Sequence, residues 1–160
     1  MENLPATEAH AWLHQLVGSW KITSDPYTPA EYAFESEETV EKIGEIWIRS
    51  RGWMPMADGR GHYESVLGFD PKLGKFVGNW IGTMMHHHWV YLGELTPDGR
   101  SLVLTSEGPA FDGSERVQTY RDIITVHSPD HRTLTSEVLG DDGEWQRFMT
   151  THQNRESNLP

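Results

Sequence analysis

The strongest constraint on the fold of this chain is the alternation of apolar and polar residues that begins at Gly18. About ten segments alternate with a period of two, and Asp-Gly pairs, which favour tight hairpin turns, follow several of them. Because no second helical pattern interrupts these segments, parallel strands joined by helices are disfavoured. The predicted strands are Ser19–Ser24, Glu37–Ile43, Glu45–Arg51, Tyr63–Phe69, Lys75–Ile81, His87–Leu95, Ser101–Ser106, Arg116–His127, Arg132–Leu139 and Glu144–His152.

An open sheet of so many antiparallel strands would leave two exposed edges, and closure into a barrel removes both. We therefore predict an all-β fold, an antiparallel up-and-down barrel of about 8–10 strands, with a β-sandwich as the competing arrangement. A barrel of this size has room for its own side chains or for one small ligand. The barrel is expected over about residues 18–155 of a single domain that covers residues 1–160.

One short helix is predicted before the strands, over about residues 7–17. Its apolar side chains, which share one helical face, are those of Ala9, Trp12, Leu13, Leu16 and Val17. Thr7 is placed to cap the N-terminus, and Gly18 is placed to end the helix in a left-handed conformation. Because so short a helix is marginal alone in water, we expect it to pack as a cap on the barrel.

Charge and composition exclude several classes of function. The chain has 13 basic and 24 acidic residues and a formal net charge of −11, so neither nucleic acid nor an anionic membrane is expected as a partner. It has no cysteine, which excludes disulfides, thiol nucleophiles and iron–sulfur clusters. No secretory signal or membrane-spanning stretch is evident, so a cytoplasmic protein is the default expectation. A homo-oligomer stays open.

The start of the first strand resembles the pattern of the lipocalin and fatty-acid-binding (calycin) proteins. Gly18-Ser19-Trp20 matches their Gly-x-Trp motif, which follows a short helix. The resemblance implies structural roles for Gly18 and Trp20, with Trp20 at the closed end of a calycin-like barrel. It also implies that a basic residue of the last strand covers this tryptophan, and Arg155 is the candidate.

Longer stretches resemble the bacterial family called domain of unknown function 1579, from about Leu13 to Arg155. They read LHQLVGSWK, GEIWIRSRGWM, LGFDPKLGKFVGNW, YLGELTPDGRSLVLTSEGP, YRDIITV and DDGEWQRFMTTHQNR. The resemblance implies a calycin-like β-barrel and no established activity. Family members often carry an Asp shortly after the position of Trp80, whereas this chain reads Ile81-Gly82-Thr83, so no role for that acid is carried over.

The stretch MMHHHWV holds three consecutive histidines. If it forms a strand, His86 and His88 share a face about 7 Å apart, by the rise of about 3.3 Å per residue, and they can chelate one ion such as zinc. The candidates for a third ligand, none at a diagnostic spacing, are His62, His127, His131, His152 and several glutamates. Pocket lining and ordinary wall or surface are the other two interpretations of His86 and His88.

Aromatic and basic side chains that share strand faces are the candidates for an interior pocket. Trp47 shares a face with Arg49 and Arg51, and Arg121 shares one with valine and isoleucine. An apolar face with one Arg is typical of an interior that binds an anionic group, and pairing with a surface acid is the alternative. The predicted ligand-binding residues are Trp47, Trp80, His86, His88 and Arg121.

The sequence thus predicts a protein that binds a small apolar or acidic molecule inside the barrel, with no cofactor expected. One alternative is an acid/base or metal-dependent enzyme that uses His86 and His88 at the barrel mouth, although no motif for a serine nucleophile, phosphate loop or zinc protease is present. A second alternative is a haem-binding barrel, with His152 near the last strand as the ligand. A third is a barrel with a solid core whose surface binds a partner chain.

Overall fold

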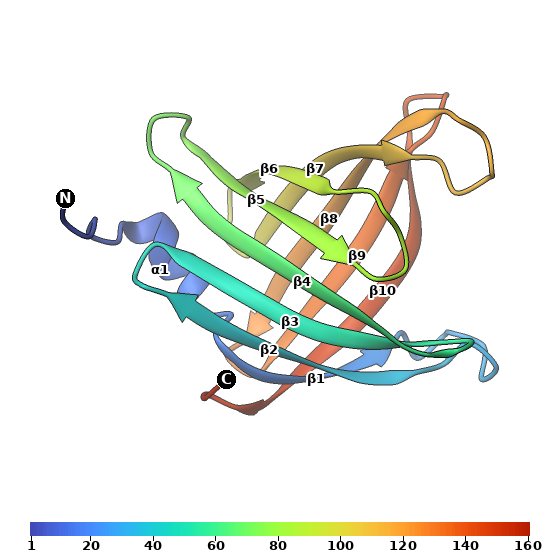
Figure 1. Cartoon of the computed structure of the whole chain (residues 1–160), viewed down its shortest axis with the longest axis horizontal. Helices are drawn as coiled ribbons and strands as arrows, with labels where there is room; N and C mark the ends of the chain where they lie inside the picture. Colours follow the sequence, from blue (N-terminus) through green and yellow to red (C-terminus); the bar gives the residue numbers. More distant parts are fainter.

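Ten antiparallel strands close into a barrel in the computed structural model of the chain, which describes residues 1–160 (Figure 1). Each strand pairs with its neighbours in the sequence, and β1 pairs with β10 to close the sheet. The strands are β1 (Gly18–Ser24), β2 (Glu35–Ile43), β3 (Trp47–Met56), β4 (Gly59–Asp70), β5 (Lys75–Gly82), β6 (Trp89–Leu95), β7 (Ser101–Pro109), β8 (Val117–Ser128), β9 (His131–Leu139) and β10 (Trp145–Ser157). The predicted up-and-down barrel is confirmed, and the sandwich alternative is wrong.

The hairpin between β3 and β4 is longer than the sequence predicted. Its strands run to Met56 and from Gly59, which are cross-strand partners, so the connection is tight. The sequence predicted strands that ended at Arg51 and began at Tyr63. Proline is rare inside a sheet because it has no backbone N–H to donate. Pro55 is nevertheless accommodated near the tip of the hairpin. β10 is also longer than predicted, and its extension to Ser157 lets it pair with β1.

The helix α1 (Glu8–His14) is shorter than the predicted range of residues 7–17. The role predicted for Gly18 is wrong in one respect, because this residue opens β1 with a φ of +141° instead of ending the helix. A Cβ atom there would lie 2.5 Å from the carbonyl oxygen of Ser157, so this close backbone approach and the positive φ require glycine. With seven residues, α1 is too short to cross a membrane, and the structure has no longer helix.

The two ends of the barrel differ in what covers them (Figure 1). α1 lies at one end, which we call the foot, near the start of β3 and the end of β4. The opposite end, which we call the mouth, carries the connections β1–β2, β3–β4, β5–β6, β7–β8 and β9–β10. Leu13 and Leu16 are buried in the core at the foot, and the indole N–H of Trp12 donates a 2.7 Å hydrogen bond to the Gly99 carbonyl. The helix is therefore fixed to the barrel by both apolar and polar contacts.

Trp20 fills the foot beneath α1. Its side chain is 2% exposed, and its indole N–H donates a 2.9 Å hydrogen bond to the Leu16 carbonyl. The guanidinium of Arg155 lies 4.2 Å from the centre of the indole ring, so the contact implied by the resemblance is present. Arg155 also donates to the carbonyls of Gln15 and Val17, which secures the chain between α1 and β1.

A second guanidinium, that of Arg132, lies 4.1 Å from the Trp20 ring and was not foreseen from the sequence. Arg132 is 3% exposed and donates hydrogen bonds to the Glu38 carboxylate and to the Gln153 amide oxygen, each at 2.5 Å. The Tyr63 hydroxyl donates to the other oxygen of Glu38 at 2.8 Å. Burial lowers the pKa of Arg132, and the charge of Glu38 opposes that shift. This buried group joins β9 to β2, β4 and β10.

Replacing Arg132 with methionine should lower the free energy of unfolding by about 3–5 kcal/mol, because the Glu38 carboxylate is then buried without its cation. Lys75→Met is the matched control, since Lys75 pairs with Glu94 at exposed positions and its loss should cost less than about 1 kcal/mol. Urea unfolding followed by tryptophan fluorescence measures both variants. Equal stability of the two variants would contradict the structural role given to Arg132.

Candidate functional site

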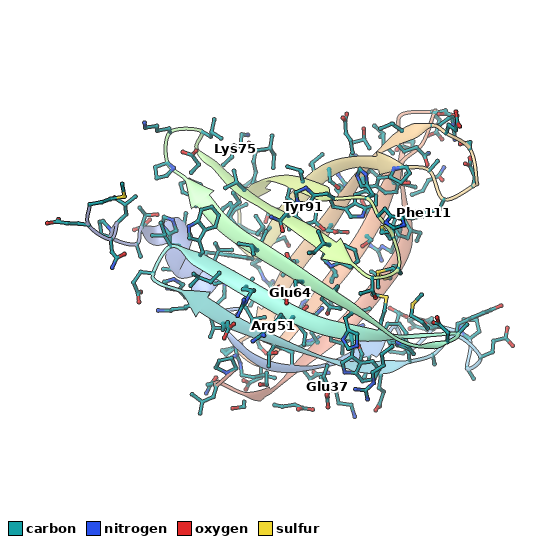
Figure 2. The ribbon with its side chains drawn as sticks, viewed as in Figure 1. Glu37, Arg51, Glu64, Lys75, Tyr91 and Phe111 are labelled. Carbon is teal, nitrogen blue, oxygen red and sulfur yellow. The ribbon has the colours of Figure 1, made fainter.

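A cavity of about 260 Å³ lies inside the barrel. Of the 25 residues that line it, 17 are hydrophobic, so its wall is mainly apolar. Leu16 and Arg132 line it toward the foot, and Phe111 and Phe148 line it at the mouth. Figure 2 shows Tyr91, another lining residue, within the barrel and Phe111 near the end that lies away from α1. The cavity therefore extends from the polar group above Trp20 to the mouth.

Methionine side chains make up much of the apolar wall near the mouth. Four of the six methionines in the chain, Met54, Met84, Met85 and Met149, line the cavity. The thioether is polarizable and its side chain is flexible, so methionine adapts to partners of different shapes. The indole N–H of Trp89 points at the Met85 sulfur at 3.0 Å. This end of the cavity can therefore adjust to ligands that differ in outline.

Aromatic rings form two groups in the same wall. Tyr120 packs edge-to-face against Trp89, with ring centres 5.1 Å apart, and also contacts Phe111 and Phe148. On the other side, Tyr63 stacks on Trp80 at 5.6 Å. Phe111 and Phe148 are 64% and 54% exposed, so apolar rings reach solvent at the mouth. Such a rim offers a first contact to an apolar molecule that enters the barrel.

The floor of the cavity is polar, and its hydrogen bonds are internally satisfied. It consists of Glu38, Tyr63, Arg132 and Gln153, whose mutual hydrogen bonds were described above. Burial, and secondly the charge of Glu38, raise the pKa of the Tyr63 hydroxyl, so this group stays protonated. The positive charge of Arg132 is balanced by Glu38, so the floor carries no net charge.

A second polar group lies higher in the wall and is centred on Asp122 of β8. The Tyr91 hydroxyl donates a 2.5 Å hydrogen bond to Oδ2 of Asp122, and the Ser136 hydroxyl donates a 2.6 Å bond to Oδ1. Burial raises the pKa of Asp122, while the two hydroxyl groups oppose the shift. Burial and the Asp122 charge in turn raise the pKa of Tyr91. All three side chains line the cavity, and no cationic side chain forms an ion pair with Asp122.

The two tryptophans predicted to bind a ligand lie on different sides of the wall. Trp80 lines the cavity, as expected, and its role in ligand binding stays a prediction. Trp47 lies on the outer face and packs over Gly68 of β4, whereas its neighbour Ile48 is the residue that faces the interior. Alternation along β3 therefore places Trp47 away from the cavity.

The inward orientation predicted for Arg121 is wrong. Its guanidinium donates a 2.5 Å hydrogen bond to Glu137 and lies 4.2 Å from the Trp145 ring centre, on the outer face of the barrel. The inner face of β8 is formed by Tyr120, Asp122 and Ile124 instead. Both faces of β8 carry isoleucine, so the alternation alone does not identify which face points into the barrel. An error of one residue in this choice exchanges the inward and outward side chains along the whole strand.

Ion pairs also lie on the outer face in another part of the barrel, where Figure 2 labels Arg51 of β3 and Glu64 of β4, which are cross-strand partners. Arg49 and Arg51 both pair with Glu41 of β2 on this face. The basic residues that share a face with Trp47 therefore belong to surface ion pairs, which was the alternative interpretation of the Arg candidates. Surface pairs of this kind contribute little to stability because solvent screens them.

His86 and His88 lie in the β5–β6 connection, so the strand predicted to begin at His87 is wrong at its start. Both side chains are exposed, and neither lines the cavity. Between them, His87 donates from Nε2 to the Glu107 carbonyl at 2.9 Å. No group of three or more His, Cys, Asp or Glu side chains is arranged to hold a metal ion. The structure therefore gives His86 and His88 no third ligand.

Three other histidines stack on the outer face near the foot. The ring centres of His127 and His131 are 4.8 Å apart, and those of His131 and His152 are 5.3 Å apart. Burial and the two neighbouring rings lower the pKa of His131. His152 alternates along β10 with Gln153, which lines the cavity, so its ring points outward. The histidine considered as a haem ligand is therefore not in the cavity wall.

Comparison with known families decides the assignment of the chain. The chain belongs to the family described as Protein of unknown function (DUF1579). The match covers residues 5–155, which includes α1 and nearly all of the barrel. A search of curated proteins finds no match. The closed barrel is consistent with the resemblance of this DUF1579 protein to the calycins, and the family description states no activity.

The sequence analysis missed the polar residues that the structure brings into the cavity. These are Glu38, Tyr63, Tyr91, Asp122, Arg132, Ser136 and Gln153. One signal could have found Asp122, since it stands between Tyr120 and Ile124 on a face that is otherwise apolar. A polar residue at the inner position of a strand is costly without a partner, so it indicates either a hydrogen-bonded group or a site.

The raised pKa of Asp122 predicts a pH dependence of stability. The native protein keeps the proton of the Asp122 carboxyl at pH values where the unfolded chain has released it. The stability that this protonation contributes is therefore full below about pH 3.9 and is lost as the pH rises through the native pKa. The amide that replaces the carboxyl in Asp122→Asn does not titrate in this pH range. The free energy of unfolding of this variant, relative to that of the natural protein, should therefore rise in urea titrations as the pH is raised above about 4. Parallel pH profiles would contradict this assignment.

Proposed function

We propose that this protein binds a small, largely apolar molecule inside its barrel. The observation that carries the proposal is the cavity of about 260 Å³ with 17 hydrophobic residues among the 25 in its wall. Typical ligand pockets have about 300–1,000 Å³, so the ligand is at the small end of the range. Transfer of its apolar surface from water contributes about 25 cal/mol per Å² buried.

Two features of the wall support a ligand with an apolar body. The four methionines near the mouth adapt to its shape, and the rings of Trp80, Trp89 and Tyr120 supply broad contact surfaces. An acidic head group, which the sequence also suggested, finds no free guanidinium. Arg121 lies outside the barrel, and Arg132 is neutralised by Glu38. The cavity wall therefore favours an apolar molecule over one that carries a carboxylate.

Titration with N-phenyl-1-naphthylamine, an uncharged fluorescent probe of apolar sites, tests this proposal. Its emission should rise when it enters the barrel of the natural protein. Ser106 is buried and lines the cavity, so Ser106→Leu fills part of the space and should weaken probe binding by at least about tenfold. Thr105→Leu adds the same side chain on the exposed outer face of the same strand and should leave binding unchanged.

Circular dichroism of both variants confirms that the barrel is intact before binding is compared. Equal affinity of Ser106→Leu and Thr105→Leu would place the probe outside the barrel and remove the proposal. Absence of any emission change with the natural protein would have the same consequence.

A further inference from the structure

Asp122 presents a fixed carboxyl group to the cavity. The hydrogen bonds from Tyr91 and Ser136, at 2.5 and 2.6 Å, engage one oxygen each and hold the carboxyl in place. A carboxylate offers about four acceptor positions, so each oxygen keeps one that the protein leaves free. Asp122 is half-buried and lines the cavity, between the buried hydroxyl groups of Tyr91 and Ser136, so its free positions are accessible to a molecule bound there.

The charges in the cavity wall do not balance. The lining includes two carboxyl groups, those of Glu38 and Asp122, and one guanidinium, that of Arg132. Arg132 forms its ion pair with Glu38 at 2.5 Å, and Asp122 forms none. A buried carboxylate is stable only if a cation or several hydrogen bonds compensate it. Whenever Asp122 is ionised, the wall therefore carries one negative charge that no side-chain cation balances.

The surroundings of Asp122 suit a positively charged group that carries an apolar body. Aromatic rings attract a cation over their faces, and the same cavity contains Trp80, Trp89 and Tyr120. The remaining wall is mostly hydrophobic and accommodates the body of the molecule. The net charge of −11 on the chain also favours the approach of cations over that of anions.

We propose that the ligand is a small apolar amine, whose ammonium group pairs with Asp122 while its hydrocarbon or aromatic part fills the cavity toward the mouth. This inference rests on the proposed function and names the chemical class of its ligand. The ammonium donates hydrogen bonds to the free acceptor positions of Asp122, and Tyr91 and Ser136 keep theirs. Any proton that the free protein holds on Asp122 passes to solvent when the amine binds.

Competition against bound N-phenyl-1-naphthylamine tests the inference with three compounds of equal chain length, n-octylamine, n-octanol and n-octanoate. At neutral pH, octylamine should displace the probe at a concentration at least about tenfold lower than octanol, and octanoate should be the weakest competitor. Asp122→Asn should reduce the preference for octylamine over octanol to less than about twofold, with both competitors measured against the probe affinity of this variant itself. Retained probe binding also shows that this variant is folded.

Glu107→Gln is the matched control, because it removes one negative charge from the exposed outer face of β7, beside β8. It should keep the full preference for octylamine. Equal competition by octylamine and octanol, or an unchanged preference in Asp122→Asn, would overturn the amine assignment and leave the proposed function in place. If the probe itself fails to bind the natural protein, the proposed function and this inference are both wrong.

Discussion

The buried guanidinium of Arg132 is the constraint on which the rest of this barrel depends. A charge at this depth is tolerated only with a complete set of partners, and these come from Glu38 on β2, Gln153 on β10 and the carbonyl that follows α1. The same guanidinium lies over Trp20, whose indole N–H donates to the same carbonyl, that of Leu16. Segments from both ends of the chain thus meet at one side chain, which closes the barrel and forms the cavity floor.

Because the foot is closed and its charges are balanced, the residues of the wall above it determine the chemistry of the cavity. The cavity combines an adaptable apolar wall with one carboxyl group, that of Asp122, which has hydroxyl partners but no cation. We infer different roles for the two polar groups: the one around Arg132 stabilises the fold, and the one around Asp122 is the proposed contact for the charged group of a ligand.

The sequence predicted the architecture well, since period-two alternation and Asp-Gly turns are local properties, and each predicted strand overlaps an observed one although several ends differ. The site was harder to predict. Trp80 lies in the cavity wall, as expected, but Arg121 was placed inside although it lies outside, because β8 has isoleucine on both faces. The contact between Trp20 and Arg155 followed from the family resemblance, whereas the pairing of Arg132 with Glu38 joins residues distant in sequence and has no local signal.

The most direct test of an interior binding site is NMR of the protein with isotopically labelled methionine methyl groups, recorded with and without n-octylamine. The account predicts that resonances of Met54, Met84, Met85 and Met149 shift on saturation, because these side chains line the cavity. The resonance of Met1, which lies exposed at the N-terminus beyond α1, should stay in place. Binding of octylamine without any shift of the four cavity methyl groups would contradict the account, because the ligand would then lie outside the barrel.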